Sequence, residues 1–170
     1  YSAFSTNAGA NTGLQPVGTF TTVNSTPISA VSVTPAIGTG QAQAFTFSYS
    51  DPNGYQNTSG SQVLISPTAS AVGQCYILFG RGTNQIALAD DTGTNFTLAP
   101  LGGQTVLQNS QCSVFAANSY QSGSGTNLFL TLFLAFKPSF AGAKNLYAGI
   151  TDNSGARSAF VQLGTWTVPA

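Results

Sequence analysis

Residues 43–54 read QAFTFSYSDPNG, and this stretch decides the fold class. Its alternation places Phe45, Phe47 and Tyr49 on one face of an extended segment, which is the period of a half-buried β-strand. Asp, Pro, Asn and Gly then follow in succession at residues 51–54 and give a strong turn signal. A short strand followed at once by a turn is the unit from which β-sandwiches and β-barrels are built.

The same unit recurs along the rest of the chain. Short alternating or apolar runs follow one another with turn residues between them, and no segment has a convincing helical period. The predicted strands are AVSVTP (30–35), QAFTFSYS (43–50), SQVLIS (61–66), CYILFG (75–80), NQIALAD (84–90), TNFTLAP (94–100), TVLQ (105–108), CSVFAA (112–117), LFLTLFLAF (128–136), NLYAGITD (145–152) and FVQLGTWTVPA (160–170). Turn residues SGSGTN (122–127) introduce the longest apolar run, and a helical turn is expected only around residues 140–145.

The longest apolar run, residues 128–136, is apolar on both faces. Such a strand is expected at the centre of a sheet or beneath a covering element. So many strands need two packed sheets to bury their apolar faces. The predicted fold is therefore all-β, an immunoglobulin-like (Greek-key) β-sandwich over residues 31–170 with an extended arm over residues 1–30, and a jelly roll stays open as an alternative.

The composition is unusual for its lack of charge. The chain has 170 residues and 42% apolar content, enough for one domain with a real core, but only 5% charged residues and no net charge. Because there is no basic excess to neutralise phosphates, neither nucleic acid nor an anionic membrane surface is an expected partner. With no histidine and four acidic residues, fold and assembly are predicted to be nearly insensitive to pH between about 3 and 9.

Cys75 and Cys112 each lie in a predicted strand with apolar neighbours. Two such strands can face each other across a core, and secreted β domains use disulfides as staples where cytosolic domains rarely do. A disulfide that closes a loop of this length stabilises the fold by roughly 4 kcal/mol in the chain-entropy description. We predict the bridge; two free buried thiols are the alternative.

No catalytic centre is predicted. A nucleophilic triad lacks its base because there is no histidine, and the cysteines are better explained as a bridge. The aspartates sit in turn sequences (DPNG, DDTG and DNSG), where Asp commonly bonds to its own backbone. No metal or cofactor is expected; the alternative is a calcium site built from loop oxygens converging at one end of the sandwich. The residues that would supply such a site are Asp51, Asp90, Asp91 and Asp152, with Asn53 and Asn153.

A few further residues are candidates for binding or modification. Trp166 is predicted to be a core residue of the last strand rather than a platform for a sugar. The tyrosines Tyr55, Tyr120 and Tyr147 can contact a glycan but are scattered in the sequence. Asn24, Asn57 and Asn95 stand in N-x-S/T sequences and are possible glycosylation acceptors. Glycine-rich pieces such as GSGTN lack the setting of a phosphate-binding loop and are predicted to be loops.

The chain has no apolar run of the roughly 18 residues that a membrane-spanning helix needs. It opens on Tyr1 rather than Met, as expected of a processed, secreted protein or of a trimmed chain. A processed start, like the predicted disulfide, is typical of an extracellular or cell-surface protein, which is the expected location.

Several dispersed blocks carry a family resemblance. They are VSVTPAIGTGQAQAFTFSYSDPNG (31–54), LQNSQC (107–112), SGSGTNLFLTLFLAFKPSFAGAKNLY (122–147), DNSG (152–155) and GTWTVP (164–169). Together they resemble a module that recurs in large secreted proteins of soil bacteria of the acidobacterial kind. The resemblance covers about residues 31–169 and implies an immunoglobulin-like architecture, a secreted location and no established catalytic activity.

The first thirty residues lie outside this resemblance. Within them, residues 14–23 (LQPVGTFTTV) have strand character but no partner in a hairpin. This segment is predicted to add a strand to the sheet of the next copy, which grows a filament by strand exchange. The residues of this polymerisation arm are Tyr1, Phe4, Leu14, Val17, Phe20 and Val23.

The expected function is therefore that of a structural subunit of an extracellular, pilus-like fibre, with copies of itself as partners. Two other fates of the arm stay open, a return onto its own domain and a disordered tail. The alternative function is an adhesive or carbohydrate-binding immunoglobulin-like module of a cell-surface protein, with glycans as partners.

Overall fold

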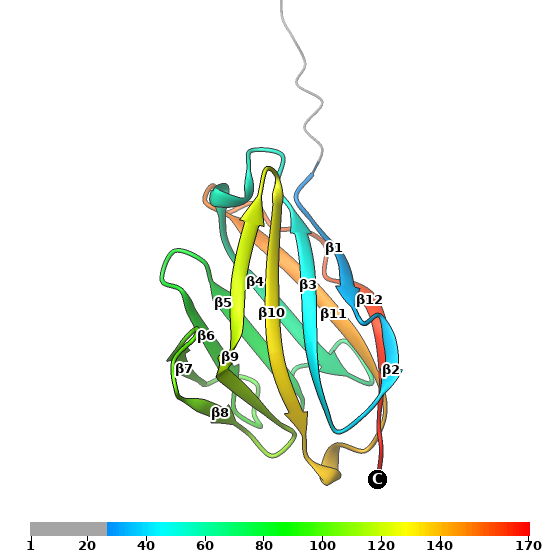
Figure 1. Ribbon diagram of the computed structural model, residues 1–170. Coiled ribbons are helices and arrows are strands. Elements are labelled where there is room, and N and C mark those ends of the chain that lie inside the picture. Colours follow the sequence, from blue (N-terminus) through cyan, green and yellow to red (C-terminus); the bar gives the residue numbers. More distant parts are fainter. Residues whose placement is uncertain (1–26) are drawn as a thin grey trace, which may run out of the picture.

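The computed structural model describes residues 27–170 and is almost entirely β-structure, arranged as two sheets (Figure 1). The five-stranded sheet contains, in spatial order, β1 (Ser29–Thr34), β3 (Ala42–Ser50), β10 (Asn127–Phe136), β9 (Cys112–Ser124) and β8 (Val106–Gln108). The seven-stranded sheet contains β2 (Ile37–Thr39), β12 (Val161–Val168), β11 (Gly142–Asp152), β4 (Thr58–Ser66), β5 (Cys75–Gly80), β6 (Gln85–Ala89) and β7 (Phe96–Pro100). Two short 3-10 turns, Tyr55–Asn57 and Pro138–Phe140, lie between strands.

The opening stretch of the sequence analysis folds as predicted. Phe45, Phe47 and Tyr49 of β3 are fully buried between the two sheets, because alternate side chains of a strand point to the same face. The turn that ends this strand is held by Asp51, whose Oδ1 accepts a hydrogen bond of 2.9 Å from the Asn53 backbone N–H. The two-sheet β architecture expected from the sequence is confirmed.

β10 occupies the central position predicted for the long apolar run, between β3 and β9. Its inward face is a row of buried leucines: Leu128, Leu130, Leu132 and Leu134. Its outward face is covered by neighbouring side chains, since the Thr131 hydroxyl lies 2.8 Å from that of Thr46 and Phe133 meets Phe115 edge-on with ring centroids 5.5 Å apart. Cross-strand pairs of this kind shield the outward face of the strand without a third layer.

The predicted disulfide is also present. Cys75 of β5 and Cys112 of β9 are joined by a bond of 2.07 Å, and both residues are fully buried. Because β5 and β9 belong to different sheets, the bond ties the two layers together through the core.

Three features differ from the sequence prediction. The short strand Ile37–Thr39, which was not expected, pairs in parallel with β12. β9 continues through the predicted turn residues to Ser124, and the reversal is completed only at Gly125, whose φ is 57°. The helical turn near residue 140 occupies Pro138–Phe140, and the chain from Gly142 onward is strand, because it pairs with β12 from its first residue.

No helix within residues 27–170 is both long and apolar enough to cross a bilayer.

Candidate functional site

β1, an edge strand of the five-stranded sheet, lies beside β12 and β2 of the other sheet, and this boundary is called the seam (Figure 1). On the five-stranded side, β1 pairs with β3 alone. On the other side, β2 pairs only with Thr165–Thr167 of β12. The first half of β12, from Val161 to Gly164, therefore has β11 on one side and no strand of residues 27–170 on the other.

The second half of β12 is closed tightly. The Thr165 backbone N–H donates to the Ala36 carbonyl at 2.8 Å, and the Trp166 indole N–H donates to the Gly40 carbonyl at 2.9 Å. Gly164 makes this contact possible, because a Cβ at that position would lie 2.3 Å from the Ala36 carbonyl oxygen. The segment that leads into β2 thus seals one half of the seam and leaves the other half open.

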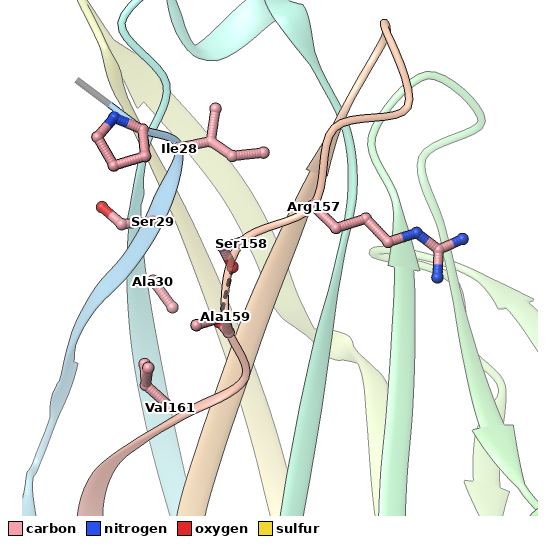
Figure 2. Close-up of a pocket in the computed structure, with 8 residues that line it drawn as sticks. Ile28, Ser29, Ala30, Arg157, Ser158, Ala159 and Val161 are labelled. Carbon is pink, nitrogen blue, oxygen red and sulfur yellow. Dashed lines mark hydrogen bonds between the residues drawn. The ribbon is translucent and has the colours of Figure 1, made fainter. Parts of the chain in front are cut away.

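The open half contains a cavity of about 290 Å³ (Figure 2). It lies between residues 27–30, where β1 begins, and residues 157–161, where the chain enters β12. Ile28, Ala30 and Val161 give it an apolar lining (Figure 2). Ile28 and Val161 are half-buried and pack against the main core, so the cavity lies next to the apolar interior.

Exposed apolar side chains flank the same seam. Val31 is 53% exposed at a β-bulge in β1, and Ile37 of β2 is 78% exposed. An edge strand with exposed apolar side chains readily pairs with a strand of another chain. Proteins usually prevent such pairing by placing charged side chains on the edge strand. β1 and β2 carry no charged residue at all.

The predicted polymerisation arm joins the domain at this cavity. Its residues Tyr1, Phe4, Leu14, Val17, Phe20 and Val23 lie outside the described residues, as does Asn24. Pro27, the first described residue, lines the cavity. Ser29 and Ala30, which the sequence analysis assigned to the arm, belong to β1.

The aspartates do not converge on one calcium site, contrary to the alternative considered from the sequence. Asp51 and Asp152 lie at the end of the molecule where β4 begins, since Asp152 is paired with Thr58. Asp90 and Asp91 lie at the opposite end, where Asp91 accepts a hydrogen bond of 3.1 Å from the Ser110 N–H. Residues 27–170 contain no group of three or more acidic, cysteine or histidine residues placed to hold a metal ion.

The aspartates instead organise their own turns, as predicted. Hydrogen bonds from the side chains of Thr92 and Asn95 hold the pKa of Asp90 well below its usual value. The Ser154 hydroxyl, with nearby backbone N–H groups, likewise lowers the pKa of Asp152. Both carboxylates are therefore ionised at neutral pH, and their oxygens accept hydrogen bonds from the turns in which they lie. Their role is to stabilise these turns.

The remaining candidate residues are spread over the molecule. The amide nitrogens of two possible glycosylation acceptors are engaged, Asn57 with Asp51 at 3.0 Å and Asn95 with Asp90 at 2.7 Å. Trp166 is 4% exposed and meets Phe45 edge-on, which confirms its assignment to the core.

The three tyrosines do not share a surface. The ring of Tyr55 covers Gly123, and Tyr120 stands 59% exposed on β9 of the five-stranded sheet. Tyr147 lies on β11 of the other sheet.

Comparison of the chain with protein-family profiles, curated proteins and solved structures gave no match. The resemblance to a secreted bacterial module and the absence of catalysis therefore stay predictions. The residues of the seam were not identified from the sequence, since Ile28 and Val161 are far apart along the chain and each reads as an ordinary strand residue.

Proposed function

We propose that the chain is a secreted structural subunit of an extracellular filament, in which the arm of one copy adds a strand at the seam of the next. One observation supports this more than any other. An apolar cavity, bordered by the unpaired edge of β12, lies at the point where the arm joins the domain.

We further propose that the strand order is immunoglobulin-like. The leading segment is split between the sheets, with β1 beside β3 and β2 in parallel with the last strand, β12. In this arrangement β1 and β12 border a seam that a further strand can cover. Because β12 already fills the last position, the arm would close that seam rather than replace a missing core strand.

Three terms set the free energy of such an addition. A strand beside residues 161–164 would pair their free backbone groups, at a net gain of about 1 kcal/mol per hydrogen bond. Apolar side chains of the arm, such as Val17 and Phe20, would enter the cavity, and burying each contributes roughly 1.5–3 kcal/mol. Ordering the arm opposes binding, because it costs about 1–2 kcal/mol of conformational entropy per residue. The free energy of adding the strand is therefore favourable only when the apolar side chains of the arm are buried in the cavity.

Binding of the arm to another copy would give head-to-tail growth. An arm that reaches out from one copy to the seam of another makes a contact between unlike surfaces, and such contacts form open filaments unless their rotation closes a ring. With only 5% charged residues, little repulsion opposes the approach of copies.

A mixed cysteine experiment tests whether the arm binds another copy. One population carries Phe20→Cys and a differently tagged population carries Val161→Cys; the native cysteines are already joined and buried. Mixing the two under mild oxidation is expected to give a mixed disulfide dimer on a non-reducing gel. Val72→Cys, at a residue 64% exposed in a loop away from the seam, replaces Val161→Cys as the matched control.

Size-exclusion chromatography supplies the second readout. Polymers of the intact chain are expected to disappear when residues 1–26 are removed. The proposal fails if the mixture gives no more dimer than the control while one chain carrying both new cysteines links internally, because the arm then pairs within its own molecule.

A further inference from the structure

The outward face of the seven-stranded sheet carries a line of large side chains. Tyr147 of β11, Leu64 of β4 and Tyr76 of β5 lie directly opposite one another across three adjacent strands. Phe160 stacks on Tyr147 with ring centroids 5.9 Å apart and planes 16° apart, and Phe96 meets Tyr76 edge-on at 5.7 Å. Leu64 is only 3% exposed although it points away from the core, and the two tyrosines stand on either side of it. These five residues are called the aromatic row.

Amide side chains line the aromatic row and fix its phenol groups. Asn145 donates to the Tyr147 hydroxyl at 3.1 Å and accepts from the Gln162 amide at 3.1 Å. On the next strands, the Tyr76 hydroxyl donates to Gln62 Oε1 at 3.2 Å. Asn145 also donates to the Pro67 carbonyl at 3.1 Å, so both of its N–H donors are used and only acceptor capacity remains on its oxygen. Gln162 keeps one N–H donor and Gln62 keeps both of its N–H donors after these contacts.

A shallow hollow of about 90 Å³ opens beside the row. Gln62 and Gly149, which are opposite each other in β4 and β11, lie along it with Phe160 and Arg157. Gly149 lets the Phe160 ring approach the sheet, because a Cβ there would lie 3.0 Å from the ring. Arg157 and Ser158 line both this hollow and the seam cavity, so the two lie next to each other. The Arg157 side chain points away from Ile28 and Val161, toward the side of the hollow (Figure 2).

The chemistry of this face matches that of a carbohydrate. An aromatic ring carries negative charge density on its face, which attracts the polarised C–H groups on the flat side of a sugar ring. The hydroxyls at the edge of the sugar require donors and acceptors of the kind that amides provide. A peptide strand has no free sheet edge to pair with here, since β11, β4 and β5 are interior strands.

The spacing of the tyrosines and the lack of charge in the row limit the class of ligand that can bind there. The two tyrosines are two strand spacings apart, about 10 Å, so a ligand that touches both must be extended. The row and its amides carry no charged group of either sign, and Arg157 lies in the adjoining hollow rather than in the row. We propose that the aromatic row binds the sugar rings of an uncharged polysaccharide chain, a function independent of the proposed strand exchange.

Isothermal titration of the full chain tests this proposal. The probes are hydroxyethylcellulose and galactomannan, which are uncharged, and polygalacturonate, which is acidic. Saturable binding is expected with at least one uncharged polymer and not with polygalacturonate. Phe160→Ala and Tyr76→Ala are each expected to weaken that binding about tenfold, as the loss of one stacked ring predicts.

Tyr120→Ala is the matched control, because Tyr120 is 59% exposed on the other sheet and should leave binding unchanged. Gln62→Ala keeps every ring but removes an amide and the hydrogen bond that it accepts from Tyr76, and it should also weaken binding. It keeps the test valid if a ring variant fails to fold, as the melting temperature of that variant would reveal. The proposal is overturned if neither uncharged polymer binds, if only polygalacturonate binds, or if the control loses as much affinity as the row variants. Loss of filaments in the row variants without any polysaccharide binding would also overturn it, since the row would then be a contact between copies.

Discussion

Removal of the Cys75–Cys112 bond is expected to cost a large part of the folding free energy. The bond closes a loop with a sequence separation of 37, for which the chain-entropy relation gives about 4 kcal/mol at 25 °C. A domain of this size unfolds with a free energy of about 5–15 kcal/mol, so the loss is severe but leaves most such domains folded. Because the unfolded chain becomes less compact without the bond, the dependence of the unfolding free energy on denaturant should also steepen.

Urea denaturation of three samples measures this effect. They are the oxidised protein, the same protein kept in reductant, and the Cys75→Ala/Cys112→Ala variant. The reduced protein and the variant should both lose about 4 kcal/mol relative to the oxidised protein, and the variant slightly more because two buried sulfurs are removed. Reductant added to the variant is the control and should change nothing. If the reduced protein unfolds within about 1 kcal/mol of the oxidised one, the bond does not act by constraining the unfolded chain.

Other changes give further expectations. Tyr49→Phe should leave the unfolding free energy unchanged or raise it by up to about 1 kcal/mol, because the buried hydroxyl makes no hydrogen bond; a loss larger than that in urea would show that the hydroxyl is bonded. Gly164→Ala should destabilise by about 1–3 kcal/mol, because its methyl group would push Ala36 off β12, and an unchanged denaturation midpoint would contradict this. The lowered pKa values of Asp90 and Asp152 are stabilising above the unfolded value of 3.8, so the melting temperature should stay flat from neutral pH down to about 4 and fall below it. A fall that began near pH 6 would show that another group titrates.

Tyr49 also shows how a buried polar group is tolerated. Burial raises its pKa strongly, and the Ser61 hydroxyl opposes that rise without meeting the geometry of a hydrogen bond. The phenol therefore stays neutral, and folding is disfavoured by this group only above about pH 10, where the unfolded chain ionises.

The local pattern of apolar residues was sufficient to predict the strands that are buried on one face or on both faces. Phe45 and Phe47 identify β3, the leucines of residues 128–136 place β10 at a sheet centre, and the cysteines are inward positions of their strands. What periodicity cannot supply is the position of one sheet relative to the other. β2 is held by Gly40 and by the parallel register with β12, neither of which leaves a pattern in the sequence.

The same limit explains what was missed at the two binding surfaces. The seam cavity depends on Ile28 and Val161, which are brought together only by the packing of the two sheets. The aromatic row depends on register: Tyr147 and Tyr76 flank Leu64 only because three strands are aligned at that level. Tyr147 was grouped from the sequence with Tyr55 and Tyr120, which lie on other surfaces, because its neighbours in the row are distant along the chain.

The directions of β1 and β12 have a mechanical consequence. The chain enters β1 at one end of the molecule and leaves β12 at the other (Figure 1). A stretching force applied between these points acts along both strands, so the hydrogen bonds that hold each to its neighbour must be strained at the same time rather than opened one after another. The covalent tie with its separation of 37 residues also withholds about 125 Å of chain from extension, at roughly 3.4 Å per residue. Such a molecule should unfold only at high force. Once unfolded, it should extend by less than the full contour length of its chain.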